Sequence, residues 1–231
     1  MNRRMTQDLA HKRPYLLASL IAGISFPATW LFLPLEGGLI ALVWKMAGVG
    51  LLVPFALHRH HVGEFVPLAI ILAFYALGDG LIEFSMVAGA LAFAVGHLVA
   101  IWLYFRHRRV SPTFSQKLLA IAIFLLTPVI AYGLPPTTDE AVQVAAYSVI
   151  LAAMAAMAWS SNFPRYRVGI GAVLFIISDL LIFAELGPLA NSKVSGIAIW
   201  YLYYFGVLMI AVGVAQTLVK RGHYAEGEER D

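Results

Sequence analysis

The sequence predicts an all-α protein, a polytopic bundle of eight transmembrane helices with both termini in the cytoplasm. Hydrophobic residues make up 61% of the 231-residue chain and charged residues only 13%, whereas soluble domains are about half apolar and a quarter charged. The apolar residues form runs long enough to cross a bilayer, and the basic residues gather between alternate runs. This composition excludes a disordered chain, a fibrous repeat and a cytosolic enzyme. The chain has no Gly-rich phosphate loop or DNA-binding pattern, so nucleic acid is not expected as a partner.

Eight runs reach the length of about 17–25 residues that a membrane-spanning helix needs. They are Tyr15–Leu33, Leu39–Leu57, Phe65–Phe84, Val87–Phe105, Leu118–Leu134, Ala141–Trp159, Val168–Leu186 and Gly196–Leu218. Because barrel strands alternate apolar and polar residues, runs this continuously apolar are predicted to be helices. The spans form a domain over residues 15–218, between an N-terminal segment of residues 1–14 and a charged tail of residues 219–231.

The placement of the basic residues predicts the orientation. With eight spans, every Lys and Arg except Lys45 and Lys193 falls on one side of the membrane. Loops rich in Lys and Arg stay in the cytoplasm, so the N-terminal segment and the charged tail are both predicted to be cytoplasmic. Losing one span would scramble this asymmetry, which therefore supports the number of helices. If the source is a bacterium, the membrane is expected to be the inner membrane.

Ionisable residues inside the spans are the first candidates for function, because each is costly to insert. They are Lys45, Asp79, Glu83, His97 and Asp179, with Glu185 at a helix end. Asp79 and Asp179 fall in the outer half of spans that run outward, Asp79 about 8 Å from its outer end. Tyr147 and Tyr203 lie at about the depth of Lys45, and His97 is near the middle of span four. This convergence predicts a buried polar cavity that opens towards the outer face.

Structural interpretations compete with a functional one at most of these positions. Glu83 lies one helical turn beyond Asp79, and we interpret it, like Glu185, as a solvated end residue. His97 is either a hydrogen-bonded packing residue or part of a site, and Lys45 either neutralises an Asp or binds substrate. Two carboxyls at matched depth can act as a coupled acid/base pair, so Asp79 and Asp179 are predicted to be functional.

Two further patterns have structural explanations. The segment His58-Arg59-His60-His61 with Glu64 contains metal-ligand residue types but lacks helical ligand spacing, so it is interpreted as a solvated loop and no metal site is expected. Small residues recur every four positions in span four, at Ala88, Ala92, Gly96 and Ala100. Such a stripe lets membrane helices approach closely, and it places His97 beside a tight helix contact.

These residues, taken in order, resemble the pattern of the YhhN family of eight-helix membrane proteins, which includes the lysoplasmalogenases. The matching positions are Lys45, Gly78-Asp79 with Leu81, Phe93 with Gly96-His97, Tyr147 and Met154, Gly171 with Phe175 and Ser178-Asp179, and Trp200 with Tyr203-Tyr204. The chain departs from the family pattern at Met46, where a Pro commonly stands, and at Val207, where a Gln does.

The resemblance implies an ether hydrolase that cleaves the vinyl ether of lysoplasmalogens to a fatty aldehyde and a glycerophospho-alcohol, with no cofactor. The implied partners are the lipid substrate and the bilayer. Asp79 and Asp179 would then be the catalytic carboxyls, one delivering a proton and the other stabilising the cation or activating water, as in glycosidases. Substrate binding would involve Lys45 at the lipid phosphate and a set of polar residues around water or the head group. This set is His97, Tyr147, Ser178, Tyr203 and Tyr204.

Two alternatives belong to other classes of protein. A proton-coupled transporter would use the two buried Asp residues as a charge relay, and the loosely similar segments 77–82 and 177–182 are compatible with a parallel repeat. Against it, no span is visibly interrupted by a Gly/Pro pair at matching positions in the two halves. A purely structural membrane scaffold is the third possibility, but it would not need two buried carboxyls.

Overall fold

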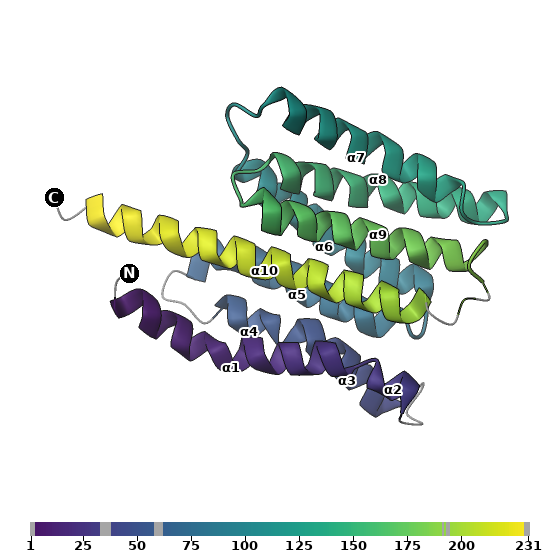
Figure 1. Cartoon of the computed structure of the whole chain (residues 1–231), viewed down its shortest axis with the longest axis horizontal. Helices are drawn as coiled ribbons and strands as arrows, with labels where there is room; N and C mark the ends of the chain where they lie inside the picture. Colours follow the sequence, from purple (N-terminus) through teal and green to yellow (C-terminus); the bar gives the residue numbers. More distant parts are fainter. Residues whose placement is uncertain (1–2, 33–37, 58–61, 191, 193–194, 229–231) are drawn as a thin grey trace. The chain divides into compact units, whose positions relative to one another are not determined.

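The computed structural model describes residues 3–32, 38–57, 62–190, 192 and 195–228, which contain helices and no strand (Figure 1). Its helices are α1 (Arg3–Ser25), α2 (Ala28–Leu31), α3 (Leu39–Gly50), α4 (Leu52–Leu57), α5 (Val62–Leu81), α6 (Met86–Arg106), α7 (Phe114–Tyr132), α8 (Thr138–Ser160), α9 (Ile170–Glu185) and α10 (Ser195–Glu228). A π-helical segment, η1 (Arg165–Gly169), leads into α9. The chain forms two compact units, residues 1–96 and 97–231, whose boundary falls inside α6.

The prediction of an all-α polytopic membrane protein is confirmed. In the described part of the chain, 7 segments are long and apolar enough to cross a membrane: Pro14–Leu31, Leu39–Leu57, Met86–Arg106, Phe114–Tyr132, Thr138–Ser160, Arg165–Glu185 and Ser195–Arg221. The third predicted span differs, because the apolar part of α5 is the shorter stretch Phe65–Leu81. The whole of α5 has 20 residues, within the range of about 17–25 that can span a bilayer.

The first two predicted spans are interrupted helices, which the hydropathy pattern did not reveal. The first run divides into α1 and α2 at Pro27, and the second into α3 and α4 at Leu51. Proline has no N–H, and its ring clashes with the carbonyl four residues earlier. Pro54 therefore cannot continue the hydrogen-bond ladder from Gly50, which is where α3 ends.

The ends of the chain also differ from the predicted boundaries. Helix α1 begins at Arg3, inside the predicted N-terminal segment, and α10 continues to Glu228, ten residues beyond the predicted end of span eight. Lys, Arg and Glu are good helix formers, so the change from apolar to charged residues at Leu218 does not end the helix. Lys193 and the segment 58–61 lie outside the described residues.

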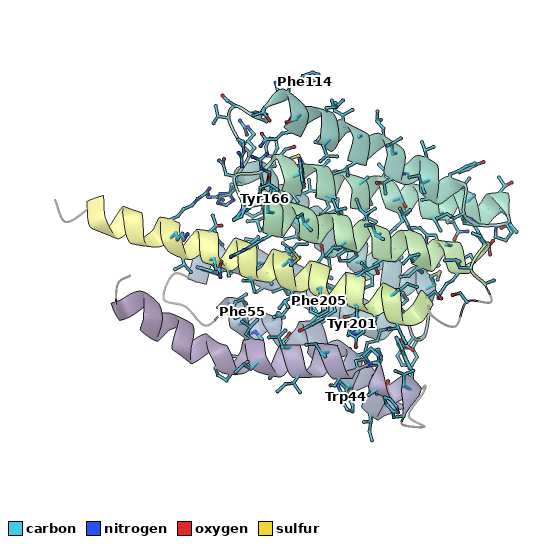
Figure 2. The ribbon with its side chains drawn as sticks, viewed as in Figure 1. Trp44, Phe55, Phe114, Tyr166, Tyr201 and Phe205 are labelled. Carbon is cyan, nitrogen blue, oxygen red and sulfur yellow. The ribbon has the colours of Figure 1, made fainter. Side chains whose placement is uncertain are left out.

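In the first unit, α1 packs against α3 and α4, and α3 and α4 pack against α5. Trp44, labelled in Figure 2, donates from Nε1 to the carbonyl oxygen of Ala22 at 3.2 Å and to the hydroxyl of Ser25 at 3.1 Å. Ser19 donates to the carbonyl oxygen of Gly48 at 2.6 Å. These bonds join α1 to α3 and satisfy polar groups that have no water to bind within a bilayer.

The second unit places α7, α8, α9 and α10 side by side in chain order (Figure 1). Helices α9 and α10 cross closely at Gly171 and Gly206. A Cβ on Gly171 would lie 2.6 Å from the carbonyl oxygen of Gly206, and one on Gly206 would lie 2.7 Å from that of Gly171. Only residues without a side chain fit this crossing, which lies about two helical turns before Asp179 on α9.

The Gly171–Gly206 crossing gives a stability prediction. We expect Gly171→Ala to lower the free energy of unfolding by about 1–3 kcal/mol, because two backbones must separate to admit the methyl group. Gly50→Ala is the matched control, since its nearest contact would be an ordinary 3.7 Å to the Cβ of Ala76. Unfolding titrations in mixed micelles measure both. Equal stability of the two variants would contradict the close crossing.

Candidate functional site

A chain of three polar side chains is buried in the second unit, contributed by α6, α8 and α9. The Tyr147 hydroxyl donates to Oδ2 of Asp179 at 2.8 Å, and Nε2 of His97 lies 3.2 Å from the same hydroxyl. Asp179 is 6% exposed and His97 is fully buried. Three predicted site residues from three helices therefore meet at one place.

The hydroxyl of Tyr147 determines the donor and the acceptor in both hydrogen bonds of this polar chain. It carries one hydrogen, which it donates to the Asp179 carboxylate, so it accepts the other bond from an Nε2–H of His97. If Asp179 takes up a proton and the His97 hydrogen moves from Nε2 to Nδ1, both bonds can reverse: the carboxylic acid donates to Tyr147, and Tyr147 donates to the bare Nε2. The arrangement therefore accommodates either protonation state of Asp179 without moving a heavy atom.

Aromatic rings surround the polar chain on two sides. The ring of Phe175 lies 5.0 Å from that of His97 and 5.1 Å from that of Tyr203, in edge-to-face geometry with both. The ring of Phe183 lies 6.0 Å from Tyr147, also edge to face. These contacts fix the rotamers of His97 and Tyr147, and they keep the surroundings of Asp179 apolar.

The other residues predicted to bind substrate in this unit have structural contacts. The hydroxyl of Ser178 donates to the carbonyl oxygen of Ile199 at 2.9 Å, which joins α9 to α10. Tyr203 and Tyr204 are both buried on α10, and both pack on Trp200, with ring centroids 5.8 Å and 6.0 Å away. The ring of Tyr203 contacts Phe175, which in turn contacts His97. The ring of Tyr204 stacks nearly parallel to that of Trp200.

The remaining predicted residues belong to the first unit. The ammonium of Lys45 on α3 lies 2.5 Å from Oε1 of Glu83, just after the end of α5. The two side chains are 14% and 44% exposed, so Glu83 is partly solvated, as expected of an end residue, and it also neutralises Lys45. Asp79 is buried on α5, one turn before Glu83. Glu185, the other predicted end residue, lies in the second unit and accepts a hydrogen bond from Ser195.

Helix α5, which carries Asp79, packs closely against the first half of α6. A Cβ on Gly78 would lie 2.8 Å from the Phe93 ring, and one on Gly96 would lie 2.6 Å from the Tyr75 ring. Gly96 belongs to the predicted small-residue stripe of span four. The expected close helix contact is therefore present, and it is made with α5.

Comparison with known proteins identifies the family. The model of the YhhN family matches residues 40–214, well over half of the chain. The chain belongs to the YhhN family. No match was found among the curated proteins or among the solved structures. The matched region includes all eight predicted site residues of this YhhN protein, from Lys45 to Tyr204.

Sequence reasoning missed the part played by Phe175 and the ion pair of Lys45 with Glu83. Phe175 precedes Asp179 by one helical turn, so a shared helix face was a readable signal. Lys45 and Glu83 are 38 residues apart, and nothing in their local sequence pairs them. No group of three or more His, Cys, Asp or Glu side chains suited to a metal ion occurs among the described residues.

The central position of Tyr147 gives a second stability prediction. Tyr147→Phe removes both bonds of the polar chain, so we expect the free energy of unfolding to fall by about 1–3 kcal/mol, the cost of leaving a buried polar group without its partner. Tyr132→Phe is the control, because Tyr132 is 51% exposed. Unfolding of the two variants in the same micelles provides the comparison. A Tyr147→Phe variant as stable as the control would contradict the bonded chain.

Proposed function

We propose that this YhhN-family protein is an integral-membrane hydrolase that cleaves the vinyl ether bond of lysoplasmalogens, releasing a fatty aldehyde and a glycerophospho-alcohol. The observation that carries the proposal is the buried carboxyl of Asp179, bonded to Tyr147 and through it linked to His97. A carboxyl in apolar surroundings with an adjustable hydrogen-bond chain can deliver a proton and take one back. Family membership supports the reaction class.

The chemistry requires one acid and one stabilising group. A carboxylic acid protonates the enol ether carbon that does not carry oxygen, giving an oxocarbenium ion. Water adds to the carbon bearing the oxygen and loses a proton, which restores the acid and leaves a hemiacetal. The hemiacetal then breaks its bond to the glycerol oxygen, so the aldehyde keeps the oxygen from water and the glycerophospho-alcohol leaves with a hydrogen on its oxygen.

In the proposed division of roles, Asp179 supplies the proton, and Tyr147 and His97 relay the proton lost by water back to Asp179. Asp79 is proposed as the second carboxylate, which stabilises the oxocarbenium ion or activates water. Lys45 is proposed to bind the substrate phosphate, so its ion pair with Glu83 must break when the substrate binds. Tyr203, Tyr204 and Ser178 are proposed to shape the site, and both termini are proposed to face the cytoplasm.

A proton-coupled transporter is the second candidate, and one observation favours it. The second span is interrupted between α3 and α4, and interrupted helices often form transport sites. However, those sites use interruptions at corresponding positions in two halves. In a repeat of two four-helix halves, span two corresponds to span six, which is α8, and α8 is continuous from Thr138 to Ser160. Uptake assays in proteoliposomes separate the candidates, because a hydrolase releases aldehyde without a proton gradient.

The proposed carboxyl pair predicts the effect of two substitutions. With lysoplasmenyl-ethanolamine as substrate, Asp179→Asn and Asp79→Asn should each lower aldehyde release by at least about a hundredfold, the usual contribution of a general acid or base. Mass spectrometry of the aldehyde formed by purified protein in detergent gives the rates.

Asp139→Asn is the matched control, since Asp139 lies exposed in the first turn of α8, and it should keep the rate of the unaltered protein. Full activity of both Asp79→Asn and Asp179→Asn would rule out the carboxyl pair. Loss in Asp179→Asn alone would leave a single acid and remove Asp79 from the mechanism.

A further inference from the structure

Five arginines lie within or beside one short segment of the second unit, the residues 161–167 between α8 and α9. Arg108 and Arg109 follow α6, Arg165 and Arg167 belong to the segment itself, and Arg221 lies on α10. We call these five residues the arginine cluster. In Figure 2, side-chain nitrogens gather near the labelled Tyr166, at the end of the unit where α7 and α9 begin. Among the side chains that the structure describes, which leave out those of residues 3–13, 62–64 and 222–228, no carboxylate forms an ion pair with any of the five.

The backbone beside the arginine cluster is held in place by hydrogen bonds between two loops. The amide of Arg109 donates to the carbonyl oxygen of Ser160 at 3.2 Å, and the amide of Asn162 donates to that of His107 at 2.8 Å. The Asn162 side chain donates to the carbonyl oxygen of Arg108 at 3.1 Å. The chain after α6 and the chain after α8 are therefore joined into one rigid platform.

Two guanidinium groups lie on this platform. Arg109 donates from Nη2 to the carbonyl oxygen of Ser161 at 3.2 Å, and the guanidinium of Arg221 lies over the Phe163 ring, 5.9 Å from its centroid. Phe163 is fully buried, with the rings of Tyr104 and His107 packed against it at 5.9 Å and 5.1 Å. Arg109, in the loop after α6, and Arg221, on α10, thus approach Ser161 and Phe163 of the same segment.

Three buried polar groups near this segment make no hydrogen bond within the described residues. Nε of Arg109, Nε1 of Trp159 and the hydroxyl of Tyr104 are buried and have no partner among the described residues. Leaving a buried donor without an acceptor costs about 1–3 kcal/mol. Arg167 donates to Oε1 of Gln216, a neutral acceptor that leaves its charge without a counterion. A ligand that brings several acceptor oxygens and negative charge would complement both the buried donors and the charge of the arginine cluster.

We propose that the arginine cluster binds the phosphate group of an anionic phospholipid, with Arg109 and Arg221 as the direct contacts. Guanidinium groups bind phosphate through paired hydrogen bonds, and basic sites between helices at the cytoplasmic face bind anionic headgroups. The site lies 12 residues before Asp179, counted from Arg167, or about 18 Å along the helix. It is therefore separate from the proposed hydrolase site and does not rest on that activity.

Lipid-dependent stabilisation of the full chain tests the proposal. The purified, delipidated protein in detergent is heated with added phosphatidylglycerol, phosphatidylcholine or inorganic phosphate, and the unfolding midpoint is recorded. Phosphatidylglycerol should raise the midpoint in a saturable manner, and phosphatidylcholine should do so much more weakly. A rise with inorganic phosphate alone would support a phosphate site but overturn the headgroup as its source.

Substitutions link the effect to the arginine cluster. The half-saturating concentration of phosphatidylglycerol should rise about tenfold in Arg221→Gln and in Arg109→Gln, as expected for losing one charge-assisted bond. Lys117→Gln is the matched control, because Lys117 is an exposed basic residue on α7, and it should bind as the unaltered protein does. Arg221→Gln keeps the test decisive if Arg109→Gln does not fold, since the Arg221 guanidinium lies over the Phe163 ring and makes no hydrogen bond to the side chains and backbone that the structure describes. Equal effects of the two lipids, or unchanged binding in Arg221→Gln, would overturn the proposal.

Discussion

The second unit is organised by the need to satisfy polar side chains where no water is present. Within a bilayer, a buried carboxyl must find its hydrogen-bond partners in the protein. Asp179 finds one in Tyr147, which also binds His97. This requirement fixes the rotation of α6, α8 and α9 about their own axes, because each must turn one polar side chain to the same point. The glycine crossing of α9 with α10 and the rings around Phe175 then hold that geometry in place.

Polar side chains of the second unit gather in two regions with different properties, one around Asp179 and one around Phe163. Around Asp179 the polar side chains are few, paired and enclosed by aromatic rings, which suits proton transfer at a protected position. Around Phe163 the cationic side chains are several and lack carboxylate partners within the described residues, which suits an external anion. In the first unit, the partly exposed ammonium of Lys45 is neutralised in a third way, by a direct ion pair with Glu83.

Composition and charge placement were enough to predict the helical membrane architecture, and the rarity of ionisable residues was enough to select Asp79, Asp179 and His97. The links between them were beyond the sequence, because hydropathy does not determine how far each helix is rotated about its axis. His97 therefore could not be assigned to Tyr147, nor Lys45 to Glu83. Sequence reasoning took the arginines after α6 and α8 only as a signal of orientation, since the backbone bonds that join Arg109 to Ser160 depend on the packing of distant segments. Pro54 was a readable cause of the break in span two that the apolar pattern concealed.

Proton delivery to carbon is the central claim, and deuterium incorporation tests it most directly. Purified protein is given lysoplasmenyl-ethanolamine in D₂O, the aldehyde is reduced as it forms, and the product is analysed by mass spectrometry. The account predicts one deuterium at the carbon next to the former carbonyl, because the enol ether carbon takes its proton from an acid in exchange with solvent. Aldehyde without that deuterium, or no aldehyde from folded protein, would contradict the account.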